Sequence, residues 1–439
     1  MTTASAAASA DETAAPRIQS RHVAAAVVGN WLEFYDFGVY AYFAIQIGDT
    51  FFPAASPFER LLYSLITFGI GFLFRPLGAV VFGVVADRVG RRPAMLVSFF
   101  LMGVALIGFV LTPGYRQIGM AAPLLAGFFR LVQGFALGGE VGPTTAYLIE
   151  AAPYRQRGLY GAWQSASQSL AGISAGAIGL ASAHLLSAAQ MGDWGWRLAL
   201  GLGALVLPVG LIVRRTLPET LHHDEPKLDV HPDHDPAAGQ LAAIAGHWRV
   251  ILIGVGIIAG ATVSTYVFNF MTTYVQATLH MGMRTGMLIA ITNGVAGFIG
   301  SMAGGWLSDR YGRRPLMIWP RVAFLVMILP TFMLVVRIRE PAVLLTLMAV
   351  LDVVANLALV PAFVALVESL RKDIRGVATG TIYAVTVAIF GATTQPIVAW
   401  LDHATGNPLA IAWYLMAGAL VGLIASIAMP ETVRRPGRA

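Results

Sequence analysis

The chain contains the same charged turn twice, and each copy joins two long apolar runs. The first copy, GVVADRVGRR, occupies 83–92, and the second, GWLSDRYGRR, occupies 305–314. Both follow the pattern G-x-x-x-D-R-x-G-R-R. Because three arginines and an aspartate cannot lie in hydrocarbon, each turn must lie at a membrane face. The apolar runs on either side are therefore expected to cross a bilayer.

Other short motifs repeat in the same order. Glu150 followed by Arg157 returns as Glu368 followed by Arg375, and a Pro-Glu-Thr tripeptide near the middle of the chain returns near its end. The three pairs of motifs lie 222, 218 and 212 residues apart. This nearly constant separation predicts two similar halves in parallel order, as in transporters whose halves are related by an axis along the membrane normal.

Composition fixes the class of protein. Of 439 residues, 57% are hydrophobic and 12% are charged, whereas a soluble domain carries about 25% charged residues. With about 20 residues for each span, the sequence predicts an all-α membrane protein with twelve transmembrane helices in two six-helix bundles. The expected spans are 23–46, 60–86, 94–112, 121–148, 158–186, 196–214, 249–275, 286–308, 315–336, 342–367, 376–401 and 408–429.

Positive charge predicts the orientation. Twenty of the 29 lysines and arginines fall on one side, six fall on the other, and Arg75, Arg130 and Arg321 fall inside spans. The positive-inside rule therefore places both termini in the cytoplasm. The expected division is a tail at 1–22, a bundle at 23–214, a linker at 215–248, a bundle at 249–430 and a tail at 431–439.

Several functions are not expected. Without cysteine there is no disulfide or thiolate chemistry, and the net charge of +6 follows from the topology, so it does not indicate nucleic acid. The linker's histidines and aspartates fit a solvated connector better than a metal site. No HExxH, GxSxG or Walker motif occurs. We therefore predict no catalytic residues, no metal and no cofactor.

The doubled turn on twelve spans resembles the major facilitator superfamily. GNWLEFYDF at 29–37, RPLG at 75–78 and RLVQGF at 130–135 resemble its metabolite:proton symporters, and WQSASQ at 163–168 is most similar to citrate and tricarballylate carriers. The resemblance implies a carrier that is driven by the proton gradient and works by alternating access. It also implies a monomer in the bacterial cytoplasmic (inner) membrane.

Span 1 carries a polar stripe. At about 100° per residue, Asn30, Glu33, Asp36 and Tyr40 fall within about 120° of one another on a helix. A carboxylate at the centre of a span costs about 2.5–3.5 kcal/mol, so these acids must face water or a basic partner. We interpret Asp36 and Glu33 as proton-coupling residues and Asn30 and Tyr40 as substrate-binding. A structural ion pair is the alternative.

Span 4 supplies the basic partner. Arg130, with Gln133 one turn further on, offers a planar fork that fits a carboxylate. The resemblance places a span 1 acid and a span 4 arginine at one cavity. We expect Arg130 to pair with Asp36 or Glu33 in one state and to bind the substrate carboxylate in another. A permanent salt bridge is the alternative.

Other polar residues are candidates with open alternatives. Gln164 and Gln168 share a helix face and bind either substrate or a neighbouring helix. Arg75 either adds positive field for a substrate anion or neutralises Glu140. Glu140 itself serves proton coupling or an intracellular gate.

Two further spans of the second half carry charge. Arg321 is expected to be structural and to snorkel to the cytoplasmic face. Asp352 and Asn356, four residues apart, are expected to face the cavity of the second half.

The repeated turns predict a cytoplasmic gate. Asp87 and Asp309 stand at helix ends, where an aspartate can meet the positive N-terminus of a neighbouring helix and the arginines of its own turn. Simple anchoring of topology is the alternative. The expected gate residues are Gly83, Asp87, Arg88, Gly90, Arg91, Arg92, Glu150, Arg157, Asp309, Arg310, Arg313, Arg314, Glu368 and Arg375.

The sequence thus predicts proton-coupled import of a small carboxylate, with citrate or tricarballylate preferred. Its partners are this organic anion, the proton and the lipid bilayer. Alternatives within the same branch are a dicarboxylate, 2-oxoglutarate, shikimate, or proline and betaine. Three intramembrane arginines disfavour an exporter of cationic drugs, and a sensor that binds without transport is a further alternative.

Overall fold

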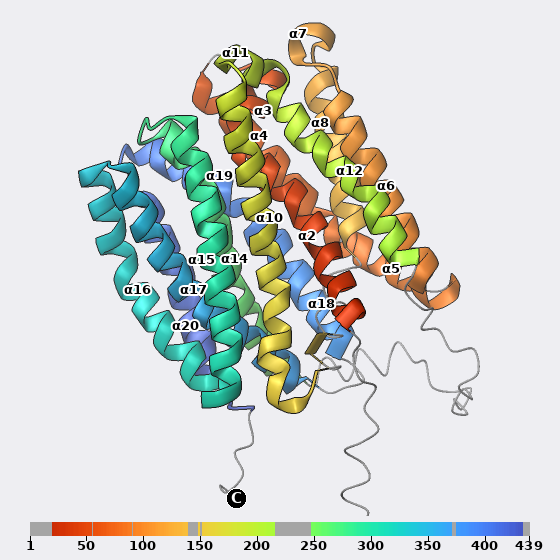
Figure 1. Cartoon of the computed structure of the whole chain (residues 1–439), viewed down its shortest axis with the longest axis vertical. Coiled ribbons are helices and arrows are strands. Elements are labelled where there is room, and N and C mark those ends of the chain that lie inside the picture. Colours follow the sequence, from red (N-terminus) through yellow and green to blue (C-terminus); the bar gives the residue numbers. More distant parts are fainter. Residues whose placement is uncertain are drawn as a thin grey trace, which may run out of the picture.

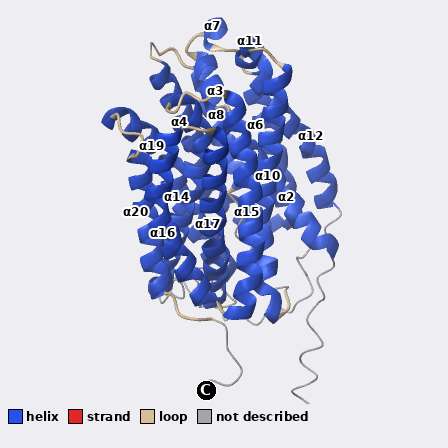
Figure 2. Cartoon of the chain, turned by 60° about the vertical axis from the view of Figure 1, so that its left-hand side comes forward, coloured by secondary structure: helices blue, strands red, loops and turns tan. Residues whose placement is uncertain are grey.

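The computed structural model describes residues 20–54, 56–89, 91–138, 148–149, 152–215, 247–370 and 375–432. These residues form helices and short connections, and none of them lies in a strand (Figure 2). The expected tail before residue 20, most of the expected linker, and residues from 433 onward lie outside the described residues. So do three predicted site residues: Gly90, Glu140 and Glu150.

The first half contains the helices of the first six expected spans. The membrane helices are α2 (Ser20–Tyr42), α4 (Pro57–Leu73), α5 (Arg75–Val89), α6 (Arg91–Leu111), α8 (Ala121–Leu137), α10 (Arg157–Leu185) and α12 (Trp196–Arg215). The shorter elements are α3 (Ala44–Phe51), α7 (Tyr115–Ile118), η1 (Tyr154–Gln156), α11 (Ala188–Gln190) and η2 (Met191–Gly195).

The second half contains the helices of the last six expected spans. They are α14 (Trp248–Ala277), α15 (Met283–Tyr311), α16 (Arg313–Ile338), α17 (Pro341–Ser369), α18 (Arg375–Thr386), the π-helical η3 (Val387–Gly391), α19 (Ala392–Thr405) and α20 (Ala410–Ala428). A helix thus overlaps each of the twelve expected spans, which confirms the all-α prediction. Seven helical stretches of the described residues are long and apolar enough to cross a membrane, and two of them join consecutive elements: Pro57–Val85 spans α4 and α5, and Ala378–Thr405 spans α18, η3 and α19.

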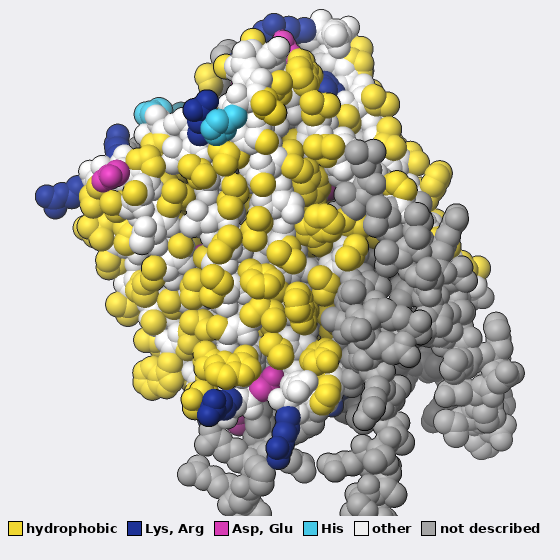
Figure 3. All heavy atoms as spheres, viewed as in Figure 1, with side chains coloured by type: hydrophobic (Ala, Val, Ile, Leu, Met, Phe, Trp, Pro, Cys, Tyr) yellow, Lys and Arg dark blue, Asp and Glu magenta, His cyan; other side chains and the backbone are white. Residues whose placement is uncertain are grey.

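The surface has the polarity of a membrane protein. In Figure 3, hydrophobic side chains cover the middle of the visible face, and most charged side chains gather toward its two ends. Large apolar side chains such as Trp319 and Val326 are about 70% exposed, at 71% and 68%. An exposed belt of this kind is expected where the neighbour is lipid.

The break between α4 and α5 positions one arginine of the site. α4 begins at a capping box formed by Ser56 and Glu59 and ends at Leu73. Pro76 has no N–H to continue the ladder, so the helix breaks at this point. α5 restarts at Arg75, which places this side chain at the bend of span 2.

The two halves meet along α10 and α15, which lie side by side in Figures 1 and 2. Both helices present small residues there. A Cβ added at Gly305 would lie 2.5 Å from the carbonyl oxygen of Gly158, and one added at Gly294 would lie 2.9 Å from that of Ser169. Only glycine allows this approach of the backbones. α4 and α19 pack similarly, since a Cβ at Gly69 would lie 2.2 Å from a carbonyl oxygen of α19.

Candidate functional site

The centre of the first half holds a buried ion pair. Arg130 of α8 donates from Nη1 to Asp36 Oδ2 of α2 at 3.0 Å, and both side chains are 2% exposed. The same Nη1 donates to Gln133 Oε1 at 2.5 Å. Two buried charges of opposite sign satisfy each other in this arrangement, and removing either partner would leave the other uncompensated.

One edge of the Arg130 guanidinium is open to a further partner. Its Nε and Nη2 are buried and have no hydrogen-bond partner among the described residues. The ring of Tyr40 lies 4.0 Å from the guanidinium carbon, and that of Phe37 lies 5.4 Å from it. The Tyr40 hydroxyl donates to the carbonyl oxygen of Ser64 at 3.0 Å. Tyr40 thus presents its ring, and not its hydroxyl, to the arginine.

Arg75 forms a second buried guanidinium beside the first. Its guanidinium carbon lies 4.7 Å from the Phe37 ring and 4.6 Å from the Phe72 ring, and the side chain is 2% exposed. Nε and Nη2 of Arg75 also have no hydrogen-bond partner among the described residues. Because both arginines lie against Phe37, the Nε–Nη2 edges of two guanidinium groups occupy one aromatic region.

The second half contributes two tyrosines to this region. Tyr383 of α18 lies within hydrogen-bonding reach of Arg75. Tyr266 of α14 lies close enough to the Arg75 guanidinium for the two groups to interact electrostatically. The Tyr266 ring packs edge-on against Phe72, with ring centroids 5.3 Å apart. Arg75 therefore lies between the halves. Neither tyrosine is among the site residues predicted above, because a tyrosine in an apolar span carries no distinctive signal.

Glu33 belongs to the same region. It is buried, and it lies near both Tyr266 and Tyr383. Glu33 and Asp36 also line a cavity of about 10 Å³ between α2, α6 and α12, which is room for about one water. Two of the three acids predicted for proton coupling, Glu33 and Asp36, thus share a small cavity.

Asn30 and Gln164 are occupied with each other. Asn30 Nδ2 donates to Ser167 Oγ at 2.7 Å and to the carbonyl oxygen of Gln164 at 3.0 Å. Gln164 Nε2 donates back to Asn30 Oδ1 at 3.0 Å. These bonds join α2 to α10, which is the helix–helix alternative considered from sequence. Gln168 is partly exposed, and its side chain has no hydrogen bond to a described residue.

Arg321 corrects one expectation. It does not snorkel to the face of the membrane, because its side chain is 5% exposed and donates from Nη1 to the Gly422 carbonyl oxygen at 2.6 Å and to Ser426 Oγ at 2.7 Å. Arg321 also lines a cavity inside the second half, together with Asp352 and Asn356.

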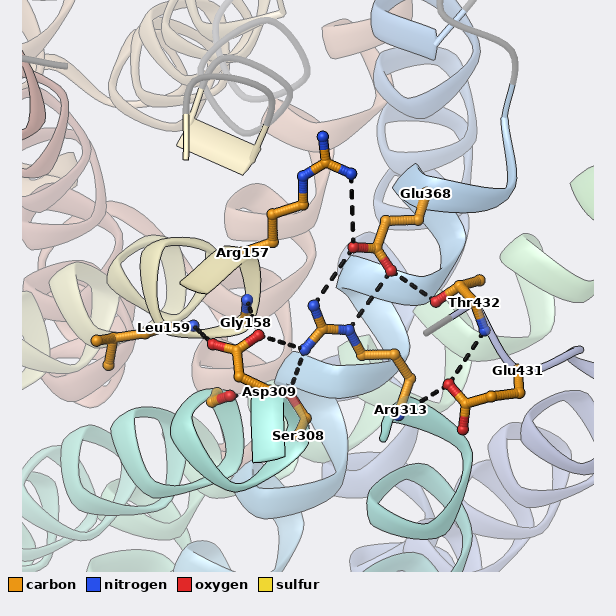
Figure 4. A network of polar contacts seen from close by, with 10 residues as sticks. Arg157, Gly158, Leu159, Ser308, Asp309, Arg313, Glu368, Glu431 and Thr432 are labelled. Atoms are coloured by element: carbon orange, nitrogen blue, oxygen red, sulfur yellow. Dashed lines mark hydrogen bonds and ion pairs between the residues drawn. The ribbon is translucent and has the colours of Figure 1, made fainter. Parts of the chain in front are cut away.

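A network of charges joins the halves at one end of the bundle (Figure 4). The Asp309 carboxylate accepts from the backbone N–H of Gly158 at 2.8 Å and of Leu159 at 2.9 Å, in the first turn of α10. It also accepts from Arg313 Nη1 at 2.7 Å. A carboxylate at a helix N-terminus is stabilised by the helix dipole and by the unpaired N–H groups there.

Arg313 connects this aspartate to the end of the chain. Its Nη2 lies 3.3 Å from Glu368 Oε1, and Thr432 donates to Glu368 Oε2 at 2.6 Å. Glu431 accepts from the backbone N–H groups of Arg313 and Arg314, both at 3.0 Å. The Pro-Glu-Thr segment therefore caps α16 and adds to the same network.

Other expected gate residues differ in their surroundings. Arg157 lies 4.0 Å from Glu368, and Arg375 donates to the carbonyl oxygen of Leu370. Arg310 is exposed beside Trp306. Gly83 faces open space. The side chains of Asp87, Arg88, Arg91 and Arg92 lie outside the described set.

The opposite end of the bundle also brings the halves together. The Phe58 ring of α4 stacks on the His403 ring of α19, with centroids 3.7 Å apart. The aromatic region around Arg130 and Arg75 therefore lies between two sets of contacts that join the halves. Among the described residues, no group of three histidines, aspartates or glutamates could hold a metal ion.

The fold and the duplicated turns define a membrane transporter. The model of the Major Facilitator Superfamily matches residues 27–394, and the chain belongs to this family. It is similar to the citrate-proton symporter of Salmonella typhi, with 34% identity over 403 residues and 91% of each chain covered. It is also similar to the proline/betaine transporter of Escherichia coli (strain K12), with 31% identity over 428 residues, 94% of this chain and 84% of that protein.

Solved structures show the same fold. The crystal structure of a D-xylose-proton symporter superimposes with a TM-score of 0.71 at 19% identity, over 94% of this chain and 98% of that one. The predictions of family, of fold and of a transporter in place of an enzyme are confirmed.

Proposed function

We propose that the chain imports a small carboxylate together with protons, with citrate or tricarballylate preferred. The observation that carries this proposal is the pair of open guanidinium edges on Arg130 and Arg75. Each Nε–Nη2 edge fits one carboxylate through two parallel hydrogen bonds. Two such edges against one ring of Phe37 suit a substrate with more than one carboxylate. The citrate-proton symporters among the relatives have this kind of substrate.

Exchange of partners at Arg130 would couple substrate and proton. When a substrate carboxylate binds this guanidinium, it competes with Asp36 for the positive charge. Asp36 then lies buried without a full counter-ion, and a buried ionised carboxylate is costly. It takes a proton from a hydronium ion that enters from the outer side, leaves water behind, and becomes neutral. After the halves reorient, the substrate leaves, Asp36 releases the proton to cytoplasmic water, and the ion pair forms again.

The network around Arg313 would serve as the cytoplasmic gate. Its bonds from Asp309 to α10 hold the two halves together, so the cytoplasmic side opens only when they break. Tyr266 and Tyr383 belong to the second half and lie beside Arg75 of the first half. Binding of substrate at Arg75 would therefore change the contacts that these two tyrosines make. Alternating access then follows from rocking of the bundles around the central region.

The same proposal places the protein in the bacterial cytoplasmic membrane as a monomer, with both termini inside. The excess of arginine and lysine on one side supports this orientation. The proton gradient supplies the driving force without a cofactor.

A zwitterion such as proline or betaine is the second candidate, because relatives with these names match at similar identity. It would use one arginine for its single carboxylate and one acid for its cation. The two candidates therefore differ in whether Arg75 is needed for affinity.

Uptake into proteoliposomes under an acid-outside gradient tests the proposal. We expect labelled citrate to accumulate and a protonophore to abolish the accumulation. Removing one fork in Arg75→Gln should raise KM for citrate about 10- to 100-fold, which corresponds to about 1.5–3 kcal/mol for a hydrogen bond to a charged group. Arg116→Gln, at an outer loop in α7, is the matched control.

Two results would contradict the proposal. If betaine or proline accumulates and citrate does not, the zwitterion reading replaces the carboxylate reading. If citrate accumulates with the same KM in Arg75→Gln and in Arg116→Gln, the Arg75 guanidinium does not bind substrate.

A further inference from the structure

The buried carboxyl group of Asp352 lines a cavity inside the second half, and the proposed cycle uses neither the residue nor the cavity. The cavity has a volume of about 30 Å³ and lies between α14, α16, α17 and α20. Its polar lining consists of Ser264, Thr265, Arg321, Asp352 and Asn356. A buried water needs roughly 10–15 Å³ and two to four polar partners. The cavity therefore has the room and the lining for about two waters.

Asp352 forms no ion pair with a described residue, although Arg321 lines the same cavity. Its side chain is buried, and Asn356 Nδ2 donates to Oδ1 at 3.0 Å. No described arginine, lysine or histidine forms an ion pair with it. This differs from Asp36, which is paired with Arg130. A buried carboxylate with one hydrogen bond is costly while it is ionised, so the neutral acid is the form that this environment favours.

The groups that face Asp352 leave it available for a proton. Among the described residues, the charged or titratable ones are Arg321 of α16, on the same cavity, and Tyr42 of α2. Arg321 directs its Nη1 to a carbonyl and a hydroxyl of α20. α14 presents Ser264 and Thr265 to the cavity.

The carboxylate also lies where the two halves meet. A Cβ added at Gly297 of α15 would lie 3.2 Å from Asp352 Oδ2 and 2.8 Å from Ser169 Oγ of α10. The second oxygen of Asp352 therefore points toward the interface between α10 and α15, which must change when the halves rock. A group in this position changes its surroundings during each cycle.

We propose that Asp352 is a second proton-binding carboxylate of the transport cycle. A hydronium ion reaching the cavity gives its proton to the carboxylate and leaves water, and cytoplasmic water takes the proton back after the halves reorient. The inference rests on the proposed proton-coupled uptake and adds one proton to it. Each added proton moves one more positive charge inward with an anionic substrate. At zero membrane potential, the ratio of internal to external substrate is then multiplied once more by the ratio of external to internal proton concentration.

The number of protons can be measured from steady-state accumulation with the membrane potential clamped at zero. Two protons per substrate give about 100-fold accumulation per pH unit, and one proton gives about 10-fold. We define the slope as the fold-accumulation per pH unit. We expect the higher slope, about 100-fold, for the unaltered protein and the lower slope, about 10-fold, for Asp352→Asn. Asp402→Asn, a carboxylate of α19 that is hydrogen-bonded to Thr278, is the matched control and should keep the higher slope. An unchanged slope in Asp352→Asn overturns the inference.

An infrared measurement separates this inference from the proposed function. Without substrate, the unaltered protein should show a carboxylic acid band that disappears at high pH, and Asp352→Asn should lack it. If the unaltered protein accumulates no carboxylate, the proposed function fails and the band still decides about Asp352. If Asp352→Asn does not fold, Asp352→Glu should retain a titrating band at a shifted frequency. A spectrum without such a band in the unaltered protein overturns the inference.

Discussion

Replacing Asp309 by asparagine is expected to open the cytoplasmic side. Its carboxylate accepts three hydrogen bonds, at 2.7, 2.8 and 2.9 Å, from Arg313, Gly158 and Leu159. Asparagine keeps one acceptor oxygen, loses the charge and turns an NH₂ group toward donors. Hydrogen bonds to charged groups contribute about 1.5–3 kcal/mol each.

The expected shift follows from the two of these bonds that join the halves, which come from Gly158 and Leu159 of α10. The Asp309 side chain is 10% exposed, so solvent screens it little. With one acceptor oxygen and the charge lost, the closed state should lose about 2–4 kcal/mol. The ratio of open to closed molecules then rises roughly 30- to 700-fold.

A single cysteine reports this change, because the chain has none of its own. Val364 of α17 is 1% exposed and packs with Ile149 and Ala162 of the first half. The side chain of Val364→Cys should therefore react with a maleimide only when the halves separate at this end. We expect the labelling rate to rise with the open population in Asp309→Asn. Asp193→Asn, at an exposed position of the short π-helix η2, is the control. Equal labelling rates in the two variants would refute the gate.

Three further predictions concern single contacts. Arg130→Lys retains the charge but not the planar fork, so KM for citrate should rise about 10-fold or more; an unchanged KM in uptake assays would exclude a bidentate contact. Gly134→Ala should abolish the monodisperse peak in size-exclusion chromatography, because its Cβ would lie 1.5 Å from the Gly71 carbonyl oxygen, whereas Gly127→Ala, with no atom within 4 Å, should keep it. Glu431→Gln weakens the cap of α16 and should cost about 0.5–2 kcal/mol; a melting temperature equal to that of the unaltered protein would argue against the cap.

The helices and the central ion pair could be predicted because the energies involved are large. A span of about 20 apolar residues has no alternative to a helix in lipid. An acid and an arginine inside spans must find each other or water, and Arg130 with Asp36 is such a pair. The repeated turn likewise required no tertiary information, since its charges alone place it outside the membrane.

The partners of Arg75 and the buried position of Arg321 could not be predicted, because both depend on how the helices rotate and pack. Arg321 reaches the carbonyl oxygen of Gly422, and a Cβ at this glycine would lie 2.9 Å from Nη1. No local pattern links these two positions, which are far apart in the chain. Tyr266 was missed for the same reason, because only the packing of α14 against span 2 brings it near Arg75.

The smooth contact between α10 and α15 has a consequence for speed. Glycines on both helices bring the backbones together, and the large side chains that cross the contact, such as Ile173 and Met287, pack over glycines of the facing helix. A side chain that faces a glycine has little to withdraw from when one helix rolls over the other. The barrier to reorientation should therefore arise at the two ends of the molecule, where the charges around Arg313 and the stacked rings of Phe58 and His403 separate. Temperature would then change the turnover rate mainly through these end contacts. The long interface between α10 and α15 would contribute little to the activation enthalpy of reorientation.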